Sequence, residues 1–105
     1  MNPQNRRRML EDMLAEAPND AELRYALAME EVGAGDHEAA IRRFRELMAL
    51  PKPNVPAFLM AAQSLLKIGR TPEAMDVLRN GVAAAQQQNN QHARDEMQGM
   101  LDSLE

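Results

Sequence analysis

The chain has 105 residues, of which 45% are hydrophobic, 27% charged and only 3% aromatic, and this fits one domain with a single core. It contains no cysteine, which excludes disulfide bridges, thiolate zinc sites and a cysteine nucleophile. Twelve lysines and arginines against sixteen aspartates and glutamates give a net charge of −4, which disfavours a nonspecific nucleic-acid or anionic-membrane binder. No signal peptide and no run of eighteen apolar residues is evident, so we expect a cytoplasmic protein.

Residues 4–18 are predicted to form a short amphipathic helix that ends at Pro18. Its apolar face consists of Met9, Leu10, Met13 and Leu14. The basic run Arg6–Arg8 at its start is interpreted as solvated surface, because Glu11 and Asp12 follow at once and the chain is acidic overall.

The next two helices are expected to form an antiparallel hairpin. Asn19 and Glu22 have the spacing of a capping box that opens the first of them, and Gly33–Gly35 ends it. Asp36 caps the second, which ends before Pro51. Because so few residues separate the two helices, the chain must fold back on itself there.

A second hairpin and a last helix follow. Pro56 in a first turn after Asn54 opens one helix, and Gly69 ends it. Thr71, with its hydroxyl, is predicted to cap the next helix, which is followed by an ordinary polar connection over residues 86–91. The apolar face of the last helix consists of Ala93, Met97, Met100, Leu101 and Leu104.

The two hairpins repeat each other at a distance of 34 residues. This shift superposes Gly35 on Gly69, and both glycines fall at turns between helices. The other identical pairs are Ala28 with Ala62, Ala40 with Ala74, Arg45 with Arg79 and Ala49 with Ala83. The first two of these alanine pairs fall where the helices of a hairpin would touch, and small residues let the backbones approach closely there.

This pattern resembles the tetratricopeptide repeat, a 34-residue helix–turn–helix unit with a small residue in its first helix and Ala-x3-Phe in its second. The matching residues are Ala28, Gly35, Ala40 and Phe44 in residues 21–54, and Phe58, Ala62, Gly69, Ala74 and Leu78 in residues 55–88. Arg24, Glu31 and Leu47 depart from the pattern, and Glu31 replaces its usual tyrosine.

The resemblance implies an all-α, right-handed superhelical solenoid that forms a single domain over residues 1–105. In it, the repeats 21–54 and 55–88 are flanked by the N-terminal helix of residues 4–18 and by a capping helix over residues 90–105. Because a helical hairpin cannot bury both of its faces alone, the flanking helices are expected to cover the two ends of the solenoid.

The resemblance also implies a binding site, since the first helices of successive repeats line a concave groove in that family. The groove positions correspond to Glu22, Tyr25, Met29, Val32, Leu59, Gln63, Leu66 and Lys67. One branch of the family holds a C-terminal carboxylate with basic side chains at such positions. Tyr25, Met29, Met60 and Gln63 stand there instead, so we predict no binding of that kind.

No residue pattern indicates catalysis, a metal or a cofactor. His37 and His92 lie far apart in the sequence and are interpreted as solvated side chains, and neither belongs to a HExxH motif. Adjacent acidic residues such as Glu30 and Glu31 point about 100° apart on a helix, so they do not converge on one substrate atom. No glycine-rich phosphate loop occurs, and we expect a protein that is not an enzyme.

The sequence therefore predicts a protein interaction module that binds a peptide or a helix of a partner in its groove. The alternative is structural, with the same apolar stripe buried in a homodimer or in a larger assembly. The sequence does not determine whether the groove is open or filled, and the solution mass distinguishes the two hypotheses.

Overall fold

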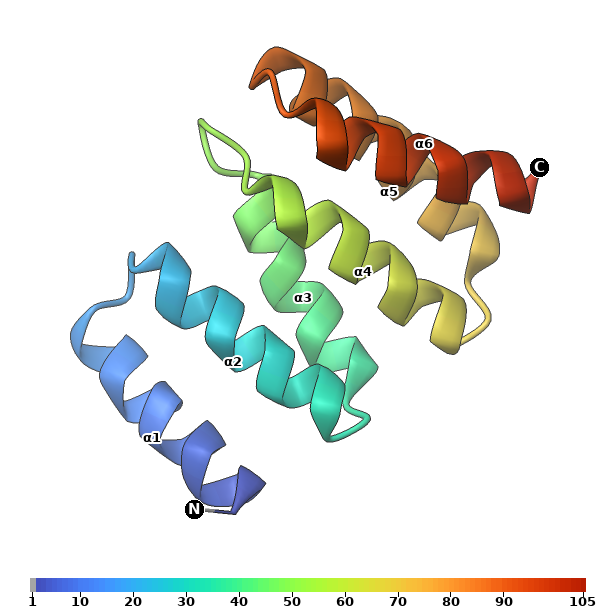
Figure 1. The fold of residues 1–105 in the computed structure, drawn as a ribbon. Coiled ribbons are helices and arrows are strands. Elements are labelled where there is room, and N and C mark those ends of the chain that lie inside the picture. The colour runs from blue at the N-terminus through green and yellow to red at the C-terminus, as the bar shows by residue number, and fades with distance from the viewer. Residues whose placement is uncertain (1) are drawn as a thin grey trace.

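The computed structural model describes residues 2–105, and over this range it contains six α-helices joined by short turns (Figure 1). The helices are α1 (Pro3–Glu16), α2 (Ala21–Gly33), α3 (His37–Met48), α4 (Val55–Lys67), α5 (Thr71–Gln87) and α6 (Gln91–Leu104). No strand occurs in the described part of the chain. The predicted all-α fold is confirmed.

Side-chain caps determine where several helices begin. The side chain of Asp36 accepts a hydrogen bond from the backbone N–H three residues later, as predicted, and the side chain of Asn54 does the same at the start of α4. The predicted cap at Asn19 is wrong, because the carboxylate of the next residue, Asp20, accepts the Leu23 N–H at 3.1 Å. A carboxylate at this position also interacts favourably with the helix dipole, which a neutral amide does not.

The start of α5 differs from the prediction as well. Arg70 is the N-cap of α5 and provides no side-chain cap, while Thr71 is the first helical residue. Arg70 instead donates two hydrogen bonds to the Glu73 carboxylate, at 2.8 and 2.7 Å. These hydrogen bonds lower the pKa of Glu73 below its ordinary value.

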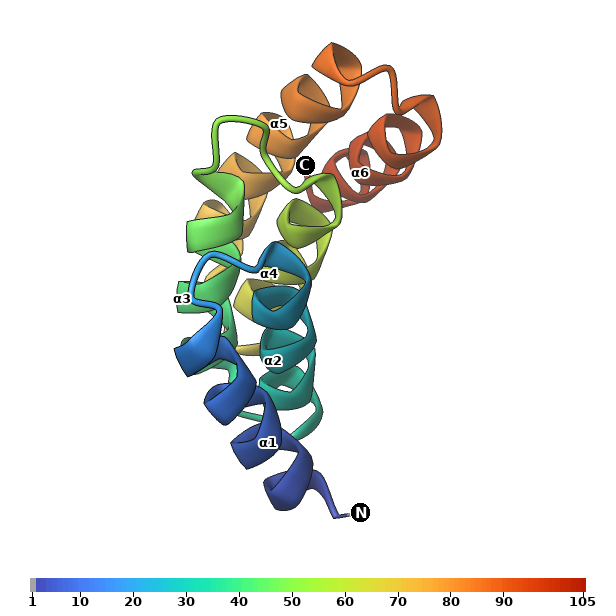
Figure 2. The same ribbon diagram turned by 90° about the vertical axis from the view of Figure 1, so that its left-hand side faces the viewer.

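The helices form two layers that stack along the solenoid. Figure 2 shows α2, α4 and α6 in one layer and α3 and α5 in the other, and Figure 1 shows the two termini at opposite ends. The principal contacts join helices that are consecutive in sequence, with a lesser contact between α4 and α6. Gly35 and Gly69 have a φ of +78° in the turns between helices, a conformation that glycine adopts without steric cost.

The core lies between the two layers and depends on small side chains. The predicted contact alanines Ala28, Ala40, Ala62 and Ala74 are all completely buried. Large side chains fill the remaining space and include Phe44, Leu47, Leu65 and Leu78. Alanine at the contacts and large residues beside them give the close packing that a stable core requires.

The N-terminal helix covers its end of the solenoid only in part. Leu10 and Leu14 are half-buried, but Met9 and Met13 are 43% and 46% exposed, so the predicted four-residue apolar face does not form one buried surface. Ion pairs also attach α1 to α2. At the other end, α6 buries Met97 and Leu101 as expected.

The ion pairs that hold α1 centre on Glu31, a completely buried carboxylate. Arg7 of α1 lies 3.0 Å from Glu31 and Arg43 of α3 lies 2.7 Å from it. Arg6 pairs with Glu30 at 2.9 Å. Arg6 and Arg8 are exposed, in agreement with their interpretation as solvated surface. That interpretation is wrong for the half-buried Arg7, which pairs with Glu31 and Asp36 as well as with the nearby Glu11.

Candidate partner-binding groove

The layer of α2, α4 and α6 contains an apolar hollow of about 270 Å³. Its lining from α2 and α4 consists of Tyr25, Val55, Pro56, Leu59 and Met60, and its lining from α6 and the preceding turn consists of Asn90, His92, Ala93, Glu96 and Met97. A second hollow of about 260 Å³ shares Tyr25 and Pro56 with the first and adds Glu22 and Asn54. We call these two adjoining hollows the groove.

Tyr25 forms the aromatic part of the groove. Its ring is half-buried and packs against Phe44 of the core, with ring centroids 5.9 Å apart and planes inclined by 62°. An edge-to-face arrangement of this kind holds the ring in a defined orientation. Burial raises the pKa of the Tyr25 hydroxyl above its ordinary value, so the side chain is neutral at physiological pH.

The structure brings only some of the predicted groove residues together. Glu22, Tyr25 and Leu59 line the two hollows. The predicted residues outside the hollows are Met29, Val32 and Leu66, which are half-buried against the core, and Gln63 and Lys67, which are exposed on α4. The hollows therefore lie toward the beginning of α2 and α4, and the other predicted positions follow further along these helices.

The predicted groove residues include none from α6, because the resemblance to the repeat family predicts only a capping role for this helix. The 34-residue repeat distance could have indicated these residues. A further shift of 34 residues takes Pro56 to Asn90 and Leu59 to Ala93, and both new positions line the first hollow. The last helix thus occupies the place of a first helix in a third repeat, and it supplies one wall of the groove.

The two histidines have different surroundings. His37 is half-buried, with its Nδ1 atom 3.1 Å from the hydroxyl oxygen of the buried Ser64, so its interpretation as a solvated side chain is wrong. His92 is exposed on the wall of the groove. Within residues 2–105, no three His, Cys, Asp or Glu side chains lie close enough to hold a metal ion. None of the six helices described is long and apolar enough to cross a lipid bilayer.

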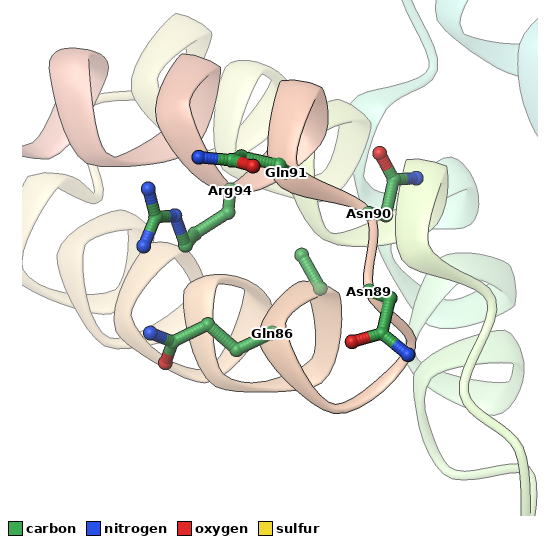
Figure 3. A pocket seen from close by; sticks show the side chains of 6 residues that line it. Gln86, Asn89, Asn90, Gln91 and Arg94 are labelled. Carbon is green, nitrogen blue, oxygen red and sulfur yellow. The ribbon is translucent and has the colours of Figure 1, made fainter.

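A more polar hollow lies at the turn between α5 and α6 (Figure 3). Its lining consists of Ala85, Gln86, Asn89, Asn90, Gln91 and Arg94. The amides there offer hydrogen bonds but no group for acid–base chemistry, and Arg94 pairs with Asp95 at 2.7 Å. The polar connection over residues 86–91 stabilises the fold, since the Gln88 side chain donates a hydrogen bond to the Pro53 carbonyl at 2.7 Å and the Asn90 side chain caps α6.

Comparisons with known proteins agree with this architecture. A family model described as tetratricopeptide repeat matches residues 31–94. The solution structure of protein BPP2914 from Bordetella parapertussis superposes with a TM-score of 0.79 at 26% identity, over 93% of this chain and 85% of that one. The structure of MamA AMB-1 gives a TM-score of 0.61 at 18% identity, over 94% of this chain and 66% of that one, a likeness of fold alone. A comparison with curated proteins found no match.

Proposed function

Because the chain belongs to the tetratricopeptide repeat family, a family of repeat scaffolds that generally bind other proteins, we propose that it is a non-catalytic interaction module. In this proposal a peptide or a helix of a partner protein lies in the groove. An apolar side chain of the partner enters the hollow between Tyr25 and Leu59. The partner contacts are made by α2, α4 and α6 together.

One observation carries this proposal: the apolar floor of the groove is open in the single chain. Tyr25, Leu59 and Met60 are only half-buried although they pack against the core. A hollow of about 270 Å³ is small for a complete drug-sized ligand, for which pockets of about 300 to 1,000 Å³ are usual. It suits a single large apolar side chain, which is the usual anchor of a protein interface.

The alternative occupant is a second copy of the chain. Met29, Val32 and Leu66 continue the half-buried apolar surface along α2 and α4 beyond the hollows. In a symmetric dimer, these side chains would face their own counterparts around a two-fold axis. Such a dimer would bury the groove and leave no room for another partner.

Leu59→Glu tests both possibilities, with Met13→Glu as the matched control outside the groove. The test uses 12-residue peptides selected from a displayed random library on the immobilised chain. We expect them to bind the wild type and Met13→Glu alike, and to bind Leu59→Glu more than about tenfold more weakly, because a buried carboxylate is costly. Tyr25 is the one tyrosine and the chain has no tryptophan, so tyrosine fluorescence reports directly on the groove.

The solution mass of the same variants, measured by light scattering over a range of concentrations, decides between the occupants. A monomeric wild type supports the peptide-binding proposal. A dimer that Leu59→Glu dissociates, and Met13→Glu does not, establishes the alternative. Selected peptides that bind Leu59→Glu as tightly as the wild type contradict the groove proposal, provided that far-UV circular dichroism shows the variant to be folded.

A further inference from the structure

The charges around the groove point to one class of partner. We propose that the bound segment carries lysine or arginine beside its apolar anchor. This inference rests on the proposed function, since it concerns the occupant of the same groove. It adds the chemistry by which that occupant is recognised.

The rim of the groove bears acidic side chains that lack cations. Glu22 of α2 and Glu96 of α6 are exposed, and each lines one of the two hollows. Among residues 2–105, neither forms an ion pair with a lysine or an arginine. The lining of the two hollows includes no lysine or arginine at all.

The acids of the opposite layer, by contrast, are neutralised within the chain. Arg70 lies 3.2 Å from Glu38 and 2.7 Å from Glu73. Arg79 lies 3.0 Å from Asp76. Arg79 also lies 3.5 Å from Glu105 after α6, and Arg43 of α3 pairs with the buried Glu31 of α2. No arginine of the described helices α3 and α5 pairs with Glu22 or Glu96, the two glutamates that line the groove.

This distribution favours a cationic partner for two reasons. Glu22 and Glu96 attract a positive segment before contact, which speeds association at low salt. When an apolar anchor displaces water from the groove, the rim carboxylates also need new hydrogen-bond donors, which lysine and arginine provide. The long stem of either side chain can lie on the apolar floor beside Leu59 while its charge reaches the rim.

The test uses three synthetic 12-residue peptides with the same pair of leucine anchors and with lysine, glutamine or glutamate at the flanking positions. Affinities are measured by isothermal titration calorimetry at low and at moderate NaCl concentration. We expect the lysine peptide to bind most tightly and the glutamate peptide most weakly. Each rim charge contributes a factor of about two to five in affinity, as is typical of exposed ion pairs, and the difference shrinks as salt is added.

The variant Glu22→Gln with Glu96→Gln removes both rim charges and nearly preserves the shape of the groove. Its matched control is Asp12→Asn with Glu16→Gln, which removes two exposed acids of α1 that have no cation among the described residues either. We expect the rim variant to lose the preference for lysine, so that it binds the lysine and the glutamine peptide with equal affinity. The control should keep the preference.

Each contrary outcome identifies what is wrong. Equal affinities of the wild type for the lysine and glutamate peptides overturn this inference and leave groove binding intact. An equal loss of preference in the rim variant and in the α1 control also overturns it, because net charge would then be the cause. If all three peptides bind Leu59→Glu as well as the wild type, the proposed function itself fails.

Discussion

Gly81 shows how closely three helices approach one another in this chain. It lies inside α5 and is buried, and a Cβ atom built on it would be 2.7 Å from the Cβ of Phe58 in α4 and 2.5 Å from the sulfur of Met97 in α6. Both distances are shorter than any ordinary contact between such atoms. Gly81 is therefore needed for its lack of a side chain rather than for backbone freedom.

Gly81→Ala is expected to destabilise the fold, and Gly99→Ala to stabilise it. Overpacking at Gly81 costs about 1 to 3 kcal/mol, which exceeds the gain of about 1 kcal/mol from replacing a helical glycine. Gly99 also lies within a helix, and a Cβ atom built on it has no neighbouring atom within 4 Å. Gly99→Ala should therefore show only the stabilisation that comes from replacing a helical glycine. Urea unfolding followed by circular dichroism measures both values. Stabilisation by Gly81→Ala would contradict the packing described here.

Glu31 illustrates what the sequence could not reveal about single residues. It departs from the repeat pattern, and the sequence shows a charge where an aromatic ring is usual. Its burial depends on Arg7 and Arg43, which reach it from two other helices. Sequence periodicity describes which residues share a face of one helix, but it contains no information about which distant cation meets a carboxylate.

At the scale of elements, α1 is held by a different set of interactions from the other helices. Its methionines are largely exposed, while Arg7 contacts Glu31 at 3.0 Å and Asp36 at 3.3 Å. Ion pairs are weakened by salt, whereas apolar contacts are not. The attachment of α1 should therefore depend on ionic strength far more than the packing of α4 between its neighbours does.

Arg7→Gln is expected to loosen α1 locally. Hydrogen exchange of the α1 amides, measured by mass spectrometry, should be faster in this variant than in the wild type, while exchange in α4 stays unchanged. Arg8→Gln is the control, because Arg8 is exposed and forms no ion pair with another described residue. Added NaCl should accelerate exchange in α1 of the wild type in the same way. Equal exchange in the two variants would mean that α1 is held by its leucines alone.

Helices and turns were the part of this fold that could be predicted, because their signals are local. Caps such as Asp36 and Asn54 and the turn glycines lie within a few residues of the structure they determine. The candidate groove was predicted less completely. Tyr25 and Leu59 could be predicted from their positions in the repeats. The groove residues of α6 could not, because they depend on how α6 packs beside α4, which is a tertiary contact.

At the scale of the whole molecule, the order of contacts follows the order of the sequence. Each helix packs mainly on the one before and the one after it, and the molecule extends over 39 × 29 × 19 Å. In such a stack each contact closes only a short loop of chain. The free energy of unfolding is then close to the sum of the stabilities of the single repeats and of the interfaces between neighbouring repeats.

Refolding is consequently expected to be fast. Helical proteins dominated by local contacts fold in microseconds to milliseconds, and this chain has the same contact pattern. Dilution from urea in a stopped-flow instrument, followed by the fluorescence of Tyr25, should show the main amplitude completed within a few milliseconds. A main phase lasting seconds would indicate non-local structure that the stack does not contain.

The position of Gly81 inside α5 also affects deamidation, a slow chemical degradation of the chain. The preceding residue is Asn80, and an asparagine followed by glycine is the sequence most prone to deamidation, because the glycine nitrogen can attack the asparagine side chain. A helical backbone keeps that nitrogen in the hydrogen-bond ladder and away from the side-chain carbonyl. The native helix is therefore expected to slow this reaction, and conversion of Asn80 to isoaspartate or aspartate should be faster in the unfolded chain than in the folded one.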